Sequence, residues 1–336
     1  MKHGGVEMRN IGIIGTGSYL PKTIWTNDDL IAKGLDTTDE WVFARTGIKQ
    51  RHIAADDEAT SDLAVQASLK AIDAAGVSVD EIDLIVLATS SPDMIQPSTA
   101  AIVQGKLGAK NAAAFDVGAV CAGFVYALTT AIGMMRGFAQ YKKVLVIGAE
   151  TYSRILDWDD RSTCVFFGDG AGAVVLSETK APGYLSHYIM TDGTGAEVIK
   201  FPAGGSRLPA SEQTLSDGLH AFQMDGRTVW NFAIEAMPDA IRKSCEYAGC
   251  DVSEIDLLIS HQANINIIKK SMETLNLPMD KTYTTIRNTA NTSGASVPIA
   301  LDAAVKAGKL KKNDILSLVG FGGGLSWGNV LIKWTK

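Results

Sequence analysis

The chain has 336 residues, of which 46% are hydrophobic and 20% charged, the composition of an ordinary soluble globular protein with a sizeable buried core. Its formal net charge of −6 argues against general nucleic-acid binding, which requires a concentration of lysine and arginine. The four cysteines form no Cys-x-x-Cys pair, so the sequence signals neither a disulfide framework nor a zinc site. We therefore expect a cytoplasmic protein without a bound metal.

The start of the chain and its longest apolar region give no sign of export or of membrane insertion. Residues 1–8 lack the apolar core of a signal peptide, and Met8 could itself be a start, which would make the first seven residues an extension without a structural role. The region Ala112–Met135 is interrupted by Asp116 and by glycines, so it divides better into a strand, a turn and a helix than into one membrane span.

Short apolar runs alternate with amphipathic helical stretches along the chain. One predicted helix covers Ser61–Ala75, with Thr60 as its N-cap and Gly76 just beyond its end. Alternation of this kind favours βαβ units and a largely parallel sheet. The fold class is therefore predicted to be α/β.

An internal repeat divides the chain into two similar parts. Three segments recur in the same order: Glu81–Val86 as Glu254–Ile259, Val144–Gly148 as Leu316–Gly320, and Gly168–Leu176 as Gly322–Ile332. The first two pairs are 173 and 172 residues apart, whereas the strands of the third are offset by 156, which places an insertion around residues 150–166. We interpret this as two duplicated α/β halves packed together, with no Pro- or Ser-rich linker between them.

Cys121 lies where an apolar strand-like run over residues 112–117 gives way to the start of a helix. A sulfur at a helix N-terminus faces unpaired backbone N–H groups and the positive end of the helix dipole, which favour the nucleophilic thiolate. The alternative is a small buried hydrophobic residue, because that is the usual place of a free cysteine.

The repeat brings two further polar residues to the same face as Cys121. His261 follows the predicted strand Ile255–Ser260, and Asn291 follows a predicted strand over Tyr283–Ile286, within the segment Asn288–Ser296 to which the repeat offset leads from Cys121. Ligands of open α/β sheets gather at the carboxyl ends of strands, where all three residues are predicted to lie. The alternatives are that His261 caps the next helix and that Asn291 is an N-cap.

A thiolate, an imidazole and a carboxamide together suit carbon–carbon bond chemistry on thioesters. The thiolate takes an acyl group from one thioester, and the two neutral donors stabilise the enolate formed when a second thioester loses carboxylate. A cysteine hydrolase uses the same three residue types, so the residue types alone leave both classes open.

Seven ordered segments carry a resemblance to a known family. They are Gly15–Pro21, Arg45–Ile48, Asp116–Leu128, Phe167–Gly172, His261–Asn264, Asn291–Ser293 and Phe321–Gly324. Through them the chain resembles β-ketoacyl-acyl-carrier-protein synthase III, of the thiolase-fold superfamily, over nearly its whole length. The resemblance implies a thiolase-like fold in a five-layer αβαβα arrangement, with residues 1–180 carrying the nucleophile and residues 181–336 the histidine and asparagine. It also implies a homodimer.

The resemblance implies a role for each residue of the reacting centre. Cys121 would be acylated by an acyl-CoA starter, and His261 with Asn291 would form the decarboxylation and oxyanion site for malonyl-acyl-carrier protein. The backbone N–H groups of Cys121 and Gly323 would line the other oxyanion hole. The aromatic rings that would wall the centre are Phe167 and Phe321. No cofactor is implied, because coenzyme A is part of the substrate.

Substrate and partner contacts are implied in the same way. Trp41 would stack on the adenine of coenzyme A, Arg45 and Arg161 would meet phosphate or base edges, Thr46 belongs to the same segment, and Asn264 would bind the pantetheine arm. Lys269 and Lys270 would dock the acidic carrier protein.

Several positions depart from the family pattern and leave the substrate open. Trp230-Asn231 replaces Phe-Lys, Asn266 replaces an arginine, and Glu273-Thr274 replaces a basic pair. Gln96 stands where an aromatic residue commonly crosses the dimer and limits acyl length. A specialised starter enzyme or acyltransferase of a polyketide or other secondary pathway is therefore the alternative. A biosynthetic thiolase is disfavoured because no cysteine follows Cys250, and a scaffold because all three reactive residues are present.

Overall fold

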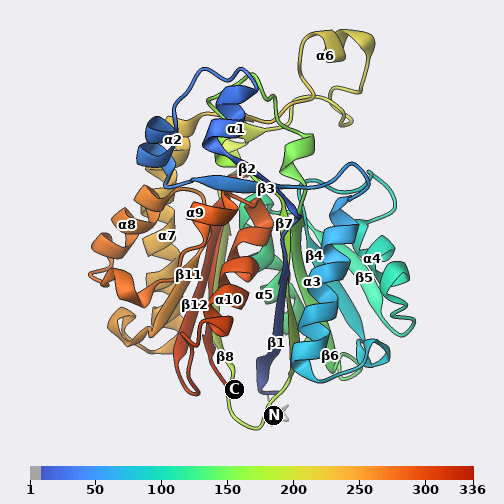
Figure 1. The fold of residues 1–336 in the computed structure, drawn as a ribbon. Coiled ribbons are helices and arrows are strands. Elements are labelled where there is room, and N and C mark those ends of the chain that lie inside the picture. Colours follow the sequence, from blue (N-terminus) through green and yellow to red (C-terminus); the bar gives the residue numbers. More distant parts are fainter. Residues whose placement is uncertain (1–8) are drawn as a thin grey trace.

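The computed structural model describes residues 9–336, so the expectations for the first seven residues lie outside it. Two sheets form the framework, with helices on both sides of each (Figure 1). The first sheet has the order β1 (Ile11–Tyr19), β7 (Gly170–Glu178), β6 (Lys143–Glu150), β4 (Leu84–Ala88) and β5 (Ala113–Val117). The second has the order β8 (Tyr184–Thr191), β13 (Ser326–Lys333), β12 (Ile315–Gly322) and β11 (Leu257–Ser260).

The layers follow from which apolar faces pack together. Helices α5 (Gly123–Gly137) and α10 (Ser296–Lys306) lie between the sheets and share one core with both. Helices α3 (Thr60–Ala75) and α4 (Thr99–Leu107) cover the outer face of the first sheet, and α7 (Gly226–Ala248) and α8 (Ile265–Thr274) that of the second. The five-layer αβαβα fold predicted for the chain is confirmed (Figure 1).

Smaller elements gather at one end of the sheets. The antiparallel pair β2 (Thr23–Thr26) and β3 (Gln50–Ile53) lies in the upper part of Figure 1 together with α1 (Asn27–Ala32) and α2 (Asp39–Thr46), which connect the two strands. The remaining elements are β9 (Ile199–Lys200), β10 (Gln223–Met224), α9 (Ile286–Thr289) and α6 (Glu212–Ser216), the last projecting away from the body.

The repeat corresponds to real structural equivalence. Strands β4, β6 and β7 occupy the same places in the first sheet as β11, β12 and β13 in the second, and β1 matches β8. The insertion also lies where it is expected, because residues 151–169 join β6 to β7 whereas residues 323–325 join β12 to β13. The boundary near residue 180 falls between the sheets but stays a prediction, since α5 and α10 pack against both.

Two local predictions are wrong. Tyr283–Ile286 is not a strand: a single bridge joins Thr282 to Leu258, and the N–H groups of Thr285 and Ile286 donate to the Gln262 side chain instead of to a ladder. Thr60 is also not an N-cap.

Helix α3 begins at Thr60 itself, with Ala59 at the cap position. The Asp62 carboxylate accepts the N–H of Ala59 at 2.9 Å, while the Thr60 hydroxyl donates to the Ser91 carbonyl at 2.5 Å. Gly76 ends the helix as predicted, with a φ of 68° that favours glycine.

Helix α5 is apolar because it is a core helix. The window Val120–Gly137 is long and apolar enough to cross a membrane, but 56% of it is buried inside the protein, between the two sheets. The division of Ala112–Met135 into strand, turn and helix is thus confirmed.

Candidate active site

A cavity of about 90 Å³ brings Cys121, His261 and Asn291 together. Its wall is mainly apolar and includes the aromatic rings of Phe167 and Phe321. The three reactive residues come from three different connections: the turn between β5 and α5, the end of β11, and the segment between α9 and α10. The structure therefore brings together the three predicted residues, although Asn291 follows a helix and not the predicted strand.

Cys121 lies in a 3₁₀ turn over Val120–Ala122, just before α5 begins at Gly123. It is 7% exposed. The backbone of β12 passes directly beside it: a Cβ on Gly322 would lie 2.8 Å from both the backbone N and the Cβ of Cys121. Position 322 therefore requires glycine, because any side chain would displace the nucleophile.

The resting form of Cys121 differs from the expected thiolate. Burial raises the pKa of the Cys121 thiol to about 12, and the hydrogen bond with Ser293 opposes this shift without cancelling it. The start of a helix is thus outweighed here by the loss of water around the sulfur. Cys121 rests as a thiol, and its proton must leave when substrate reacts.

Ser293 is the polar neighbour of the sulfur, with its hydroxyl 3.3 Å from Sγ. The residue is fully buried and adopts a φ of 46° at the start of a 3₁₀ turn over Ser293–Ala295. This tight turn points a hydroxyl group at a sulfur that is otherwise surrounded mainly by apolar groups.

His261 is held in one orientation by its neighbours. Its Nδ1 lies 2.6 Å from the Ser296 hydroxyl, which also accepts the backbone N–H of Gln262 at 3.3 Å. Among residues 9–336 the Ser296 hydroxyl has no other acceptor for its own proton, so we assign that proton to the bond with Nδ1 and the ring proton to Nε2. Burial lowers the pKa of His261 to about 3, so the ring is neutral at physiological pH. Asn264, not His261, caps α8.

Asn291 is fixed by both its backbone and its side chain. Its N–H donates to the Phe166 carbonyl at 2.9 Å, and its carbonyl accepts the N–H of Gly168 at 3.1 Å. The side-chain Oδ1 accepts the N–H of Ser293 at 2.8 Å, which leaves the NH₂ group as the donor for the cavity. The alternative that Asn291 is an N-cap is wrong, because Thr292 is at the cap position of the 3₁₀ turn and Ala295 at that of α10.

Aromatic rings surround this centre. Phe321 packs edge-on against the His261 ring with a centroid distance of 5.2 Å, and Phe167 stacks on Tyr152 at 4.7 Å. The turn after β12 contains Gly323, where an added Cβ would lie 3.2 Å from Ile199. The predicted role of the Gly323 N–H in an oxyanion hole stays a prediction.

Three residues that the family resemblance assigns to coenzyme A lie together on the surface. Arg45 and Arg161 both approach the ring of Trp41, with guanidinium carbons 5.9 and 5.5 Å from its centroid. Trp41 is 37% exposed, so one side of this cluster faces solvent. Asn264 borders the cavity and donates to the Arg45 carbonyl at 2.9 Å, which ties α8 to α2.

Thr46 does not share that exposure. Its side chain is fully buried, its hydroxyl donates to the Val42 carbonyl at 2.7 Å, and the same oxygen accepts the N–H of Ile48 at 3.0 Å. The Thr46 side chain therefore has a structural role at the end of α2, and its predicted place in the coenzyme A site stays a prediction.

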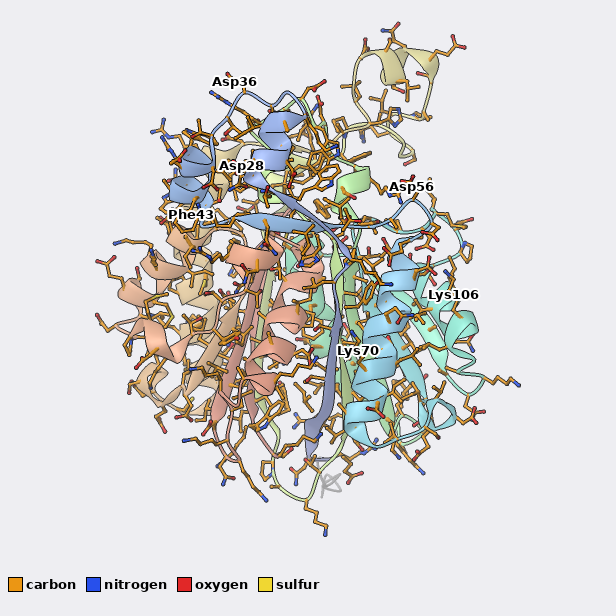
Figure 2. All side chains as sticks on the ribbon, viewed as in Figure 1. Asp28, Asp36, Phe43, Asp56, Lys70 and Lys106 are labelled. Carbon is orange, nitrogen blue, oxygen red and sulfur yellow. The ribbon has the colours of Figure 1, made fainter. Side chains whose placement is uncertain are left out.

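Lys269 and Lys270 are exposed on α8. Lys270 pairs with Glu273 at 2.9 Å, whereas Lys269 borders a surface hollow with Phe43 and Arg287. Arg287 lies over the Phe43 ring at 5.2 Å, and Figure 2 shows Phe43 at the surface on α2. Nothing in the local sequence around Arg287 distinguishes it from a solvated arginine, so sequence reasoning missed it.

Comparison with known proteins identifies the family of this chain. Residues 115–193 match the family model described as 3-oxoacyl-[acyl-carrier-protein] synthase III, and residues 245–334 match the model of its C-terminal part. A relative from Clostridioides difficile strain 630, a β-ketoacyl-[acyl-carrier-protein] synthase III, is 50% identical over 324 residues, covering 96% of this chain and 98% of the relative. This chain belongs to the β-ketoacyl-[acyl-carrier-protein] synthase III family.

Solved structures support the same family. A 3-oxoacyl-[acyl-carrier-protein] synthase III from Aquifex aeolicus VF5 is 43% identical, with a TM-score of 0.88, covering 96% of this chain and 100% of that one. The priming β-ketosynthase of the R1128 polyketide biosynthetic pathway is 33% identical, with a TM-score of 0.91, covering 100% and 99%. The thiolase-like fold expected from the sequence is thus shown.

The sequence reasoning overlooked the residues that orient this synthase site. Ser293 and Ser296 lie within the segment that carries Asn291, and Gln262 follows His261, so position alone could have marked them. Glu150 is a charged residue directly after the apolar run Val144–Ala149, which is an unusual place for a carboxylate. Among residues 9–336, no group of three or more His, Cys, Asp or Glu side chains could hold a metal ion.

Proposed function

We propose that this chain condenses an acyl-CoA starter with malonyl-acyl-carrier protein and so initiates fatty acid biosynthesis. The observation that carries the proposal is one cavity that a thiol shares with two neutral hydrogen-bond donors, His261 and Asn291. A hydrolase must also activate water, whereas here the pKa of His261, lowered to about 3 by burial, makes the ring a poor base.

The reaction proceeds in two stages. Cys121 attacks the carbonyl carbon of acyl-CoA, the carbon–sulfur bond to coenzyme A breaks, and the acyl group stays on Cys121. The malonyl thioester then loses CO₂, and its enolate oxygen accepts hydrogen bonds from Nε2–H of His261 and from the Asn291 amide. The enolate carbon attacks the acyl group, and the Cys121 sulfur leaves.

The direct test uses a panel of acyl-CoA thioesters and intact-mass measurement. At least one thioester should add the mass of its acyl group to the wild-type chain, and Cys121→Ala should abolish that addition. If none of them adds mass at Cys121, this function is wrong. The acyl group that is accepted also separates primary metabolism from a specialised starter pathway. The specialised pathway is the alternative because of Gln96 and because of the likeness to a polyketide priming enzyme.

The substrate surfaces belong to the same proposal. The Trp41, Arg45 and Arg161 cluster suits the adenine and phosphates of coenzyme A, because an exposed ring can stack on a base and guanidinium groups bind phosphate. Lys269 and the neighbouring Arg287 suit the acidic surface of a carrier protein.

We also propose that the protein is a cytoplasmic homodimer. The four cysteines are free, which fits a reducing compartment. Strand β5 forms the outer edge of the first sheet, and the loop before α4 exposes Met94 and Ile95, the latter by 84%. An unpaired strand edge with apolar neighbours favours a self-complementary contact. Light scattering at micromolar concentration would give the mass of two chains.

A further inference from the structure

Glu150 is a buried carboxylate that does not line the Cys121 cavity. It ends β6 and accepts backbone N–H groups from Ser90 at 3.0 Å, Ser91 at 3.1 Å and Gly294 at 3.2 Å. The hydroxyls of Ser90 and Ser91 donate to it at 2.9 and 2.6 Å. Among residues 9–336 no cation forms an ion pair with it. A carboxylate buried without a counter-charge is costly: burial raises the pKa of Glu150, and its dense set of donors opposes that shift by favouring the ionised form.

Two serine hydroxyls connect this carboxylate to the reacting sulfur. The Ser293 hydroxyl lies 3.3 Å from Sγ of Cys121 and 3.5 Å from the hydroxyl of Ser90, which donates to Oε1 of Glu150. Because the single proton of Ser90 points to Glu150, its oxygen accepts from Ser293, and Ser293 in turn accepts from the thiol. Each hydrogen bond between Cys121 and Glu150 is then donated in the same direction, from the sulfur toward the carboxylate.

We propose that Glu150 takes up the thiol proton of Cys121 through Ser293 and Ser90, and holds it for as long as the acyl group remains on the enzyme. The inference rests on the proposed acyl transfer at Cys121. Ser293 contacts the reacting atom, whereas Glu150 is a positioning residue that acts through the two hydroxyls.

The proton balance closes over the whole cycle. During acylation the sulfur–carbon bond forms, the bond to coenzyme A breaks, and the proton of the Cys121 thiol is relayed by Ser293 and Ser90 to Glu150. Coenzyme A leaves as a thiolate and takes a proton from water. During condensation the Cys121 sulfur leaves as a thiolate, and Glu150 returns the stored proton along the same path. The cycle therefore ends with a thiol and a carboxylate, as it began.

The charges around Glu150 suit this exchange. The titratable groups that face it are the Cys121 thiol and the Tyr152 phenol, whose hydroxyl lies 3.3 Å from that of Ser90. The pKa of both is raised, mainly by burial and further by the carboxylate charge. Burial also raises the pKa of Glu150, which brings it closer to that of the thiol. Proton transfer between them is thereby made easier.

An electrostatic role alone predicts the opposite effect of neutralising Glu150. In Glu150→Gln the loss of negative charge lowers the pKa of Cys121 and increases the thiolate fraction, so a purely electrostatic effect would speed acylation. With a relay, the same variant acylates more slowly despite its lower thiol pKa. The two explanations therefore predict opposite changes in the acylation rate of Glu150→Gln.

The experiment measures single-turnover acylation by acetyl-CoA from pH 6 to 9, with rapid quenching and intact mass. The acylation rate of the wild type should not depend on pH above the range in which Glu150 titrates. Glu150→Gln, Ser293→Ala and Ser90→Ala should be about 100-fold slower at pH 7 and gain about tenfold per pH unit, because hydroxide must then remove the thiol proton. Thiolate absorbance at 240 nm, with Cys121→Ala as the blank, gives the thiol pKa of each variant.

Ser91→Ala is the matched control. It removes a hydroxyl that donates to the same carboxylate but does not contact Ser293, so its acylation should stay independent of pH. The two relay serine variants keep the Glu150 charge, so the test holds even if Glu150→Gln fails to fold.

Three results would overturn the relay. A pH-independent Glu150→Gln rate would mean that water in the 670 Å³ cavity beside Ser90 accepts the proton instead. Faster acylation by that variant would leave a purely electrostatic role. Equal slowing in Ser91→Ala would indicate a structural role. Failure of wild type to be acylated by any thioester would instead contradict the proposed function.

Discussion

The hydroxyl group of Ser296 lies 2.6 Å from Nδ1 of His261 and thereby determines which ring nitrogen carries the proton. The two residues are 35 positions apart, at the end of β11 and the start of α10. Helix α10 belongs to the central layer, so the core of the molecule sets the protonation of a reacting group.

Removing this contact should impair condensation and spare acylation. In Ser296→Ala the His261 ring is free to place its proton on Nδ1, so Nε2 no longer donates to the enolate. We expect condensation to fall about 100-fold, as for the loss of one oxyanion donor. Rates of the two half-reactions, measured separately, check this. Ser271→Ala is the control, because the Ser271 hydroxyl is buried without a partner in the described part of the chain.

Asn291→Ala tests the second donor. The variant loses the NH₂ group that faces the cavity, and condensation should fall about 100- to 1000-fold while Cys121 still takes up an acyl group. The readouts are product formation from malonyl-acyl-carrier protein and the mass of the acylated chain. Equal loss of both half-reactions would contradict the separate roles of Cys121 and Asn291.

The buried His261 should make the fold sensitive to acid. Its pKa is about 3 in the folded state, below the ordinary value of 6.5. Between these two pH values the unfolded chain therefore binds a proton at His261 that the folded chain does not bind. Its contribution to stability is complete above pH 6.5 and is lost as the pH falls toward 3, by up to about 1.4 kcal/mol per pH unit. Urea unfolding of wild type and His261→Asn over this pH range measures the contribution of His261. The difference between the unfolding free energies of the two proteins should shrink as the pH falls.

Trp41→Ala should weaken acyl-CoA binding without slowing acyl transfer. Loss of one stacking platform corresponds to about a tenfold higher KM for acyl-CoA with kcat unchanged. Phe43→Ala is the matched control, since Phe43 lies on the same helix with nearly the same exposure but contacts Lys49 and Arg287 instead. An equal effect of both variants on this KM would contradict the assignment.

Charge reversal on α8 should separate the two lysines. Lys269→Glu is expected to raise the KM for malonyl-acyl-carrier protein about fivefold, and Lys270→Glu less, because the Lys270 charge is already paired with Glu273. Lys312→Glu, on the connection between α10 and β12, makes the same change of net charge elsewhere and should have no effect. Steady-state kinetics at low salt, where surface charges are least screened, give the comparison.

Patterns local in the chain predicted the architecture and the reactive residues. Repeated apolar runs identify β4 with β11 and β6 with β12, and the ends of β5 and β11 locate Cys121 and His261. Properties that depend on surroundings were not predictable in this way. Contacts with residues far away in the sequence decide three such features. They are the neutral thiol of Cys121, the burial of Thr46 and the absence of a strand after Thr282.

The shared central layer also limits how a substrate can enter. Helices α5 and α10 each pack against both sheets, so the halves cannot swing apart as hinged domains do. Reactants must instead reach Cys121 in a cavity of about 90 Å³ whose walls both sheets hold in place. The dimensions of this cavity therefore limit which acyl groups can react, independently of the reactivity of the sulfur.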